Sequence, residues 1–259
     1  MAEIRPLILV VNDDGITAPG IRALISYVKE FGDIIVIAPD KAMSGMGHAI
    51  TINDTLRLNK LSSDIGIEEY SCSGTPVDCV KFGTKVVSKN RKIDLVVSGI
   101  NHGTNSSINV IYSGTMSAAV EGSVEGISSI GFSLDNHAAD ADFSACESYV
   151  KTIVRKMLDD PAEKGFSLNV NFPNVPKEEI KGLRVCRQAK AYWEETFDER
   201  KDPSGGSYYW LTGEFKYQDS GEDTDIWALG NNYVSVVPTK FDLTDYDAIK
   251  TLNDWDGNK

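Results

Sequence analysis

The sequence predicts an α/β fold: a doubly wound, mostly parallel sheet with a C-terminal β-hairpin extension. As far as residue 172, short apolar runs alternate with amphipathic stretches, which is typical of right-handed βαβ units. The first run, residues 7–11, reads LILVV without a polar interruption, as in a strand that is buried on both faces of a parallel sheet. Past about residue 185, aromatic residues become denser, and a polar, glycine-containing stretch separates two strand-like runs. This change in composition and pattern predicts a long β-hairpin arm.

The individual elements follow from periodicity and from the residues that begin and end them. In the first helix, at 20–31, apolar side chains recur every three or four residues, Pro19 suits the first turn and Gly32 ends the helix. Residues 50–71 are expected to form short strands or a hairpin. The same patterns predict strands at 34–38, 94–98, 127–134, 167–172 and 233–237, and helices at 76–87, 116–125, 143–158, 224–229 and near the C-terminus. We expect a main domain at 1–185 and an extension at 186–259.

Composition narrows the classes of function. The 26 Lys and Arg residues against 38 Asp and Glu leave a net charge of −12, which argues against a broad nucleic-acid or anionic-membrane surface. The four cysteines form no C-x-x-C pair, so we expect buried free thiols rather than a zinc site or a disulfide framework. The N-terminal apolar run is shorter than the about 7 to 15 residues of a secretory signal, and no stretch has the roughly 18 apolar residues of a membrane helix. We therefore expect a soluble, cytoplasmic chain.

Two adjacent carboxylates follow the first predicted strand. In an open parallel sheet, ligands bind at the carboxyl ends of the strands, and Asp13 and Asp14 stand at such an end, before Gly15. Adjacent carboxylates repel each other unless a cation neutralises them, which favours a metal site. The alternative is that Asp14 or Thr17 caps the following helix.

The second strand is followed by a glycine-containing loop that includes Ser44. Its G-x-G, at 45–47, is weak support for a dinucleotide site, because it follows the second strand and Ile50 stands where a third glycine belongs. The loop is either a flexible connection or the source of a Ser44 hydroxyl at the same end of the sheet as the aspartates.

A long uncharged segment indicates anion binding. Residues 95–120 contain no Asp, Glu, Lys or Arg and are rich in Gly, Ser, Asn and Thr. Ser113, Gly114 and Thr115 stand where a helix should begin, so their backbone amides would point at an anion. Ordinary capping by a hydroxyl explains a short start, but not a loop of about 15 residues, which in a compact domain is usually functional. Asn101, directly after the third strand, offers a carbonyl oxygen to the same place.

The candidate ligands at these strand ends are hard oxygen donors: Asp13, Asp14, Ser44 and Asn101. Such donors select Mg²⁺ or Mn²⁺ over zinc, and four protein oxygens around an octahedral ion leave room for water and a phosphate oxygen. This arrangement suits metal-assisted phosphoester hydrolysis. Of the three histidines, His102 is a candidate acid or base or simply a solvated loop residue, whereas His48 and His137 have weaker claims. No G-x-S-x-G elbow is present.

Seven motifs, in order along the chain, resemble the SurE family of stationary-phase survival nucleotidases. They are ILVVNDDGITAPGI at 8–21, APDKAMSGMGHAIT at 38–51, CSGTPVDCV at 72–80, SGINHGTN at 98–105, YSGTMSAAVEG at 112–122, NVNFP at 169–173 and TDIWALGNNYVSVVP at 224–238. Each motif is modest alone, but the seven in this order are specific to the family. The chain departs from the usual family pattern at Ser107, Asn109 and Met116.

The resemblance implies a Rossmann-like, SurE-type catalytic domain and a divalent-metal-dependent phosphatase. Its substrates would be nucleoside 5′- and 3′-monophosphates and, in some members, short polyphosphate. The acidic composition already leads us to expect no nucleic acid polymer and no membrane as partner. By position, the ligands of one Mg²⁺ or Mn²⁺ ion per subunit match Asp13, Asp14, Ser44 and Asn101, of which Asp13, Asp14 and Asn101 are also expected to be catalytic. The phosphate contacts match Asn105, Ser113, Gly114 and Thr115. The family also implies a homodimer or homotetramer that exchanges the C-terminal arm between subunits.

The expected mechanism is in-line attack on phosphorus by a water that the metal, or Asp13, helps to deprotonate, with donors at 113–115 stabilising the developing charge. A protein oxygen as the nucleophile stays open. Three other classes compete with this interpretation. A haloacid-dehalogenase-type phosphatase needs D-x-D after the first strand, where the acids here are adjacent. A nucleotide or phosphate sensor would bind without turnover, and a Rossmann oxidoreductase is disfavoured because NDDG replaces the glycine fingerprint.

Overall fold

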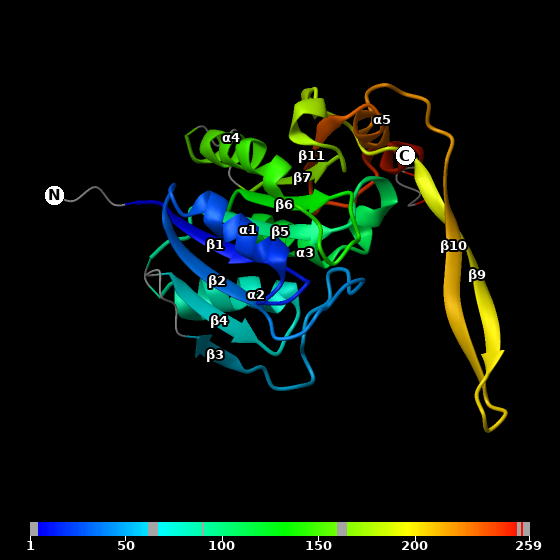
Figure 1. Ribbon diagram of the computed structural model, residues 1–259, viewed down its shortest axis with the longest axis horizontal. Coiled ribbons are helices and arrows are strands. Elements are labelled where there is room, and N and C mark those ends of the chain that lie inside the picture. Colours follow the sequence, from blue (N-terminus) through cyan, green and yellow to red (C-terminus); the bar gives the residue numbers. More distant parts are fainter. Residues whose placement is uncertain (1–4, 62–66, 90, 160–164, 253–254, 256–259) are drawn as a thin grey trace.

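A nine-stranded sheet forms the centre of the computed structural model, which describes residues 5–61, 67–89, 91–159, 165–252 and 255 (Figure 1). Its strand order is β3-β4-β2-β1-β5-β6-β7-β11-β8. The strands are β1 (Leu7–Val11), β2 (Asp33–Pro39), β3 (Leu58–Leu61), β4 (Glu68–Cys72), β5 (Leu95–His102), β6 (Ser129–Leu134), β7 (Ser167–Phe172), β8 (Gly182–Val185) and β11 (Tyr233–Thr239).

The central strands, from β4 through β7 in the sheet, run parallel to one another. The antiparallel pairs of this sheet are β3 with β4 and β7 with β11. From β1 the chain passes first to β2 on one side and later to β5 on the other, so the strand order reverses beside β1. The doubly wound, mostly parallel sheet is thus confirmed, and its topological switch point lies next to the carboxyl end of β1.

Helices cover both faces of the sheet. On one face, α1 (Pro19–Val28) and α4 (Glu147–Asp159) pack in a core that includes Ile8 and Val10. On the other face, α2 (Pro76–Phe82) and α3 (Gly114–Val124) pack in a core that includes Leu9 and Val11. Alternate side chains of a strand point to opposite faces, so β1 is buried on both, which is why its sequence is continuously apolar.

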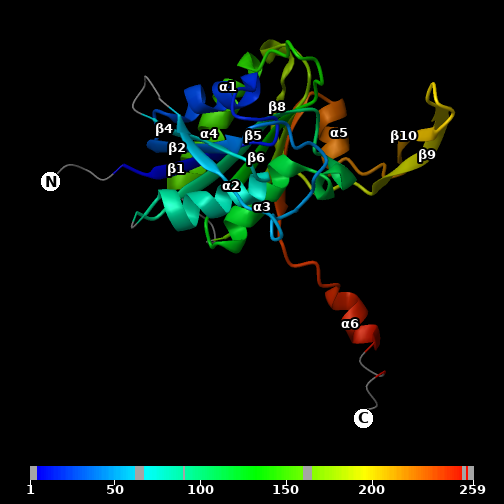
Figure 2. The same ribbon diagram turned by 90° about the horizontal axis from the view of Figure 1, so that it is seen from below.

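The predicted hairpin arm is confirmed. β9 (Ala191–Lys201) and β10 (Ser207–Tyr217) pair antiparallel along their whole length and project from the body as a separate two-stranded sheet (Figure 1). The chain then returns through α5 (Asp225–Gly230) and β11 to the main sheet. The last helix, α6 (Tyr246–Leu252), stands away from the body in the view of Figure 2.

The third parallel strand differs from the expectation. β5 continues to His102, with a register shift against β6 between Ser98 and Asn101, so Asn101 lies in the last part of the strand rather than after it. Gly99 permits this irregularity, because its φ is +122° and a Cβ there would lie 2.3 Å from the carbonyl oxygen of Phe132. A 3₁₀ helix at Ser107–Ile111 occupies much of the remaining segment, so the long loop expected before α3 is replaced by shorter connections.

Smaller differences concern helix ends. The predicted helix at 76–87 is α2 followed by a π-helix at Gly83–Val87, and a 3₁₀ turn at Ser144–Cys146 precedes α4. All four cysteines are buried and free, as expected. Within the described ranges, none of the helices combines the length and the apolarity that a membrane crossing needs.

Candidate active site

Most of the predicted site residues meet at the switch point of the sheet. A cavity of about 510 Å³ opens there, and its walls include Asp13 after β1, Ser44 after β2 and Asn101 at the end of β5. Asn105 and Ser113 line the same cavity. The remaining predicted residues, Asp14, Gly114 and Thr115, are attached to this group through contacts with Asp13 or with the end of β5.

Asp13 is the buried acid of the site, with only 3% of its surface exposed. Burial raises the pKa of Asp13 from 3.8 to about 6, while a hydrogen bond from the Thr115 hydroxyl to Oδ1 opposes the shift and the charge of Asp14 adds to it. A carboxylate in this position is destabilised in its ionised form, and a cation close by would remove that penalty.

Asp14 does not cap the following helix. The N-cap of α1 is Ala18, which makes no side-chain hydrogen bond, and Pro19 occupies the first helical turn. The Asp14 carboxylate instead lies by the end of β5, where its Oδ2 accepts a long hydrogen bond of 3.4 Å from the backbone N–H of His102. Burial raises the pKa of Asp14, which that N–H partly offsets. The capping alternative for this aspartate is therefore wrong.

Asn101 is oriented for an acceptor role. Its Nδ2 donates to the carbonyl oxygens of Gly103, at 2.8 Å, and His102, at 3.2 Å. With the amide nitrogen committed to the backbone on one side, Oδ1 is left as the group that can serve a ligand in the cavity.

The segment that carries Ser44 is attached on both sides of that residue. The backbone N–H of Met43 donates to the carbonyl oxygen of Asp13 at 2.7 Å, which ties the segment to the end of β1. Farther along, the His48 ring contacts the buried Glu121 carboxylate of α3 at 2.9 Å. Ser44 is thus held beside the aspartates rather than in a free loop.

The first turn of α3 sits directly on Asp13. Ser113 is the N-cap, and its Oγ accepts from the backbone N–H of Met116 at 3.0 Å, which leaves its hydroxyl hydrogen for another acceptor. A Cβ on Gly114 would lie 2.6 Å from the Cβ of Asp13, so only glycine permits this approach. The predicted start of this helix is confirmed, and its positive dipole end lies beside the cavity, where it favours an anion.

Asn105 is held by a network of buried amides that sequence reasoning missed. Its backbone N–H donates to Oδ1 of Asn171 at 2.7 Å, and Asn169 donates to its carbonyl oxygen at 2.8 Å. Its own Nδ2 donates to the Ser133 hydroxyl at 2.8 Å. The available signal was the pair of asparagines in NVNFP, because two amides in a buried strand need partners.

Asp225 is a second residue that sequence reasoning missed. It is fully buried and accepts hydrogen bonds from the backbone N–H groups of Ser107 at 2.7 Å, Ala189 at 2.9 Å and Ile226 at 2.9 Å. One carboxylate therefore joins the segment before α3, the foot of the hairpin arm and the start of α5. In the sequence it reads only as an acid in the first turn of a short helix.

The donor set fits a hard divalent cation. Two carboxylates, a hydroxyl and an amide oxygen are the ligand types that Mg²⁺ and Mn²⁺ accept, and the buried acid and the oriented Asn101 oxygen are consistent with such an ion. The described part of the chain brings no three His, Cys, Asp or Glu side chains together, so a zinc-type cluster is not formed there.

Two of the three histidines line the cavity. His102 donates from Nδ1 to the carbonyl oxygen of Ala138 at 3.0 Å and packs edge-on against Phe143, with 5.1 Å between ring centroids. His137 also lines the cavity, and its ring covers Gly103. An acid or base role for His102 stays a prediction.

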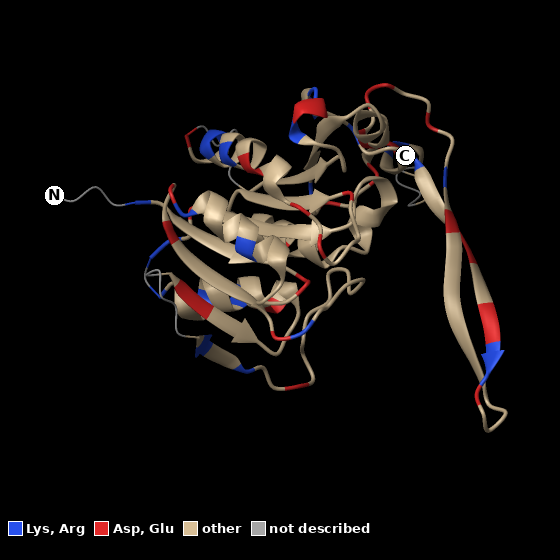
Figure 3. Cartoon of the chain, in the orientation of Figure 1, with Lys and Arg blue, Asp and Glu red and all other residues tan. Residues whose placement is uncertain are grey.

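Among the described residues, those that line this cavity include no Lys or Arg. Figure 3 shows Lys and Arg scattered over the chain rather than gathered in one stripe, and residues 95–120 contain neither. The α3 N-terminus is therefore the source of positive potential for an anion that the chain itself places beside this cavity.

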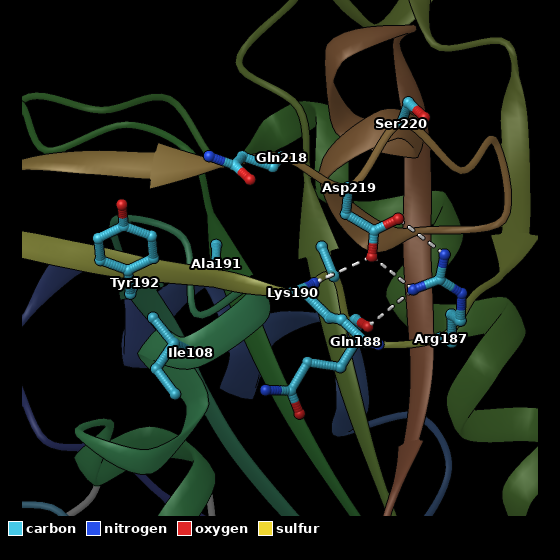
Figure 4. Close-up of a pocket in the computed structure, with 10 residues that line it drawn as sticks. Ile108, Arg187, Gln188, Lys190, Ala191, Tyr192, Gln218, Asp219 and Ser220 are labelled. Carbon is cyan, nitrogen blue, oxygen red and sulfur yellow. Dashed lines mark hydrogen bonds and ion pairs between the residues drawn. The ribbon is translucent and has the colours of Figure 1, made fainter.

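A larger cavity, of about 1020 Å³, lies at the foot of the arm (Figure 4). Its Arg187 is committed to carboxylates, with hydrogen bonds of 2.6 and 2.9 Å to Asp219 and 2.8 Å to Asp223. Asp219 also accepts from the backbone N–H of Lys190 at 3.1 Å. These contacts hold the two ends of the arm together. The charged side chains of this cavity therefore have a structural role.

The fold and the site define a class: an α/β protein with hard oxygen donors and a helix N-terminus facing one another at the switch point of a doubly wound sheet. Within that class, the chain belongs to the SurE family, because the family model for "Survival protein SurE" matches residues 8–195. The chain is 59% identical to the 5′-nucleotidase SurE of Flavobacterium psychrophilum over 98% of this chain and 99% of that protein. It is 60% identical to the 5′-nucleotidase SurE of Flavobacterium johnsoniae over 98% of each. The crystal structure of the SurE protein from Aquifex aeolicus superposes with a TM-score of 0.83 at 40% identity, covering 98% of this chain and all of that one.

Proposed function

We propose that this chain is a divalent-metal-dependent 5′-nucleotidase, which hydrolyses nucleoside 5′-monophosphates, and also 3′-monophosphates, to nucleoside and phosphate. The observation that carries this proposal is the cavity in which Asp13, Ser44 and Asn101 face the N-terminal end of α3. The names of the highly similar relatives support the nucleotidase activity. Short polyphosphate is a further substrate that we expect.

The oxygen donors named above would hold one Mg²⁺ or Mn²⁺ ion: Asp13, Asp14, Ser44 and Asn101. When bound, such an ion supplies positive charge to the phosphate and lowers the pKa of a coordinated water. Thr115 donates to Oδ1 of Asp13 and so fixes the orientation of the buried carboxylate. This aspartate is therefore positioned to accept a proton from a water attacking phosphorus in line.

The N-terminal end of α3 would bind the phosphate. The free hydroxyl hydrogen of Ser113 and the backbone amides at 114 and 115 would donate to its oxygens, which carry more charge in the transition state than in the substrate. Asn105, immobilised by Asn169 and Asn171, lines the same end of the cavity and would complete the contacts.

The experiment that tests this function is phosphate release from AMP, GMP, CMP and UMP in Mn²⁺, in Mg²⁺ and in EDTA, for the wild-type chain and for Asp13→Asn. We expect release that requires the metal and falls by orders of magnitude in Asp13→Asn. Asp140→Asn, an exposed acid outside the cavity, is the matched control and should keep full activity. Binding of nucleotide without release under any metal would contradict the enzyme and favour a sensor.

A further inference from the structure

The active-site cavity has an aromatic wall on the side of the hairpin arm. Trp193 of β9 and Phe215 of β10 both line it, together with Asn109 and Tyr112 of the segment that leads into α3. Trp193 and Phe215 are cross-strand partners, with ring centroids 5.3 Å apart and an interplanar angle of 62°. No step proposed above for phosphate or metal uses these two rings.

The wall is held in place at its centre by one hydrogen bond. The indole Nε1 of Trp193 donates to Oδ1 of Asn109 at 2.8 Å. Asn109 lies one short 3₁₀ turn before Ser113, so this bond links the arm to the same segment that would bind phosphate. Among the described residues, Nδ2 of Asn109 has no hydrogen-bond partner, which leaves an amide donor facing the cavity lining.

The foot of the arm is attached to the body by several hydrogen bonds. Asp225 binds the backbone of Ala189 and of Ser107, and the Arg187–Asp219 pair joins the two ends of the hairpin (Figure 4). Trp193 is 40% exposed, whereas Phe197 farther along β9 is 71% exposed. The aromatic wall is therefore preorganised with respect to the phosphate end of the cavity.

We propose that Trp193, Phe215 and Asn109 form the nucleobase subsite. In this subsite the Trp193 ring stacks against the base and Phe215, whose ring is inclined by 62° to that of Trp193, contacts the base edge-on. The Asn109 amide donates to a ring nitrogen or a carbonyl oxygen of the base. This inference rests on the proposed nucleotidase function. It adds the residues that would distinguish a nucleotide from a phosphate ester without a base. Stacking tolerates any base, since every base has a π-face, so the subsite predicts broad acceptance of bases and a strong preference for nucleotides over phosphate esters without a base.

The test compares kcat/KM for AMP with kcat/KM for ribose 5-phosphate, which lacks the base. In Trp193→Ala we expect a loss of roughly 5- to 150-fold with AMP, mainly through KM, the range that corresponds to one lost base–aromatic stack. The loss with ribose 5-phosphate should be much smaller. Trp193→Phe, which keeps a ring, should recover most of the AMP activity.

Tyr192→Ala is the matched control. Tyr192 precedes Trp193 on the same strand, so its side chain points to the other face, and it lines the larger cavity of Figure 4 rather than the active-site cavity. Tyr192→Ala removes an aromatic ring from the foot of the arm without changing the lining of the active-site cavity. Because Tyr192 is also more exposed than Trp193, its loss should disturb packing less. We expect its kcat/KM for both substrates to stay at the wild-type level.

Equal losses with AMP and ribose 5-phosphate in Trp193→Ala would overturn the subsite and assign Trp193 a purely structural role, and so would wild-type values for both. Failure of the proposed function is distinguishable, because the wild-type chain would then release phosphate from neither substrate. In that case calorimetric titration with AMP still decides the subsite. Unchanged affinity of Trp193→Ala for AMP overturns it, and a weakening of roughly the same 5- to 150-fold order supports it.

Discussion

Asp13 occupies a position where its ionised form is unfavourable. The folded chain holds the Asp13 proton more tightly than the unfolded chain, because burial raises its pKa from 3.8 to about 6. The stability that this group contributes is therefore present below about pH 4 and is lost as the pH rises through about 6. Near neutral pH, the buried charge costs roughly 3 kcal/mol in a chain that holds no cation. The ionised Asp13 thus lowers the stability of the folded chain, and a bound cation would restore that stability.

We predict that Asp13→Asn stabilises the protein in EDTA near neutral pH, because an amide replaces a buried charge. The gain in melting temperature should shrink as the pH falls to about 5, where the wild-type carboxyl is protonated. Added Mn²⁺ should raise the melting temperature of the wild type and not that of the variant. Differential scanning fluorimetry across pH gives both comparisons, and a variant that melts below the wild type in EDTA at neutral pH would contradict this account.

Gly114 determines how closely α3 approaches Asp13. In Gly114→Ala the new Cβ would lie 2.6 Å from Cβ and 2.8 Å from Oδ2 of Asp13, so helix and carboxylate must separate. Because misplacement of about 1 Å can cost 10²-fold in rate, we predict a loss of kcat/KM of that order. Gly230→Ala, at the end of α5, is the control, since a Cβ there meets nothing within 4 Å. Equal activity of the two variants would show that the close approach is unimportant.

At the scale of elements, the segment between β5 and α3 is held by side chains from distant strands and helices. Asn169 and Asn171 of β7 support Asn105, and Asp225 of α5 supports Ser107, whose φ is +54°. A non-glycine residue at positive φ is costly unless its surroundings stabilise it, and the Asp225 carboxylate does so here. Geometry at the phosphate end thus depends on elements that contribute no ligand.

We predict that Asp225→Asn lowers the free energy of unfolding by about 1–3 kcal/mol, because an Nδ2 group would face a backbone N–H that has lost its acceptor. Hydrogen exchange should become faster at the amides of Ser107 and Ala189, which the carboxylate now binds. Glu222→Gln, at an exposed acid nearby, should change neither quantity appreciably. Identical exchange rates in the two variants would show that the Asp225 carboxylate does not stabilise the backbone at Ser107 and Ala189.

Local patterns predicted those parts of the fold that local chemistry determines. The run LILVV indicated β1 because a strand with two buried faces needs apolar side chains at every position, and Ser113 indicated the start of α3 because capping is a short-range interaction. The end of β5 pairs with β6, where Asn101 lies opposite Ser133, and Asn105 is held by Asn169 and Asn171, more than sixty residues away. Sequence spacing carries no signal for such contacts, and the extension of β5 to His102 was missed for the same reason.

The candidate site was predictable to a similar degree. The strand-end rule predicted that Asp13, Ser44 and Asn101 lie close together, and the cavity at the switch point unites them. The aromatic wall was not predicted, because Trp193 reaches the site only through the attachment of the arm to Asn109. In the sequence it is one of several aromatic residues in a strand-like run.

At the scale of the whole molecule, the arm exposes large apolar side chains that a monomer leaves in water. Phe197, Tyr209, Trp210 and Leu211 are each more than half exposed, and an isolated two-stranded hairpin is marginally stable at best. We propose that the arm packs against another subunit, in a homodimer or homotetramer. The division into a catalytic domain at 1–185 and an oligomerisation extension at 186–259 is part of the same proposal.

We predict that shortening the arm abolishes assembly and leaves the main fold intact. Thr196 and Thr212 are cross-strand partners, so replacing residues 197–211 by Asn-Gly joins them through a two-residue turn and keeps Trp193 and Phe215. Light scattering coupled to size-exclusion chromatography should show a monomer for this variant and an oligomer for the full chain. A full chain that is monomeric throughout, or a shortened chain that still assembles, would contradict the proposal.

The central claim is that one cavity at the switch point holds both the cation and the phosphate. The most direct measurement is the anomalous diffraction of crystals grown with Mn²⁺ and a nucleoside monophosphate. The account predicts a manganese peak bound by oxygen atoms of Asp13, Asp14, Ser44 and Asn101, with the phosphate at the start of α3 and the base against Trp193. A manganese ion outside this cavity, or a phosphate bound beside Arg187 in the cavity of Figure 4, would contradict it.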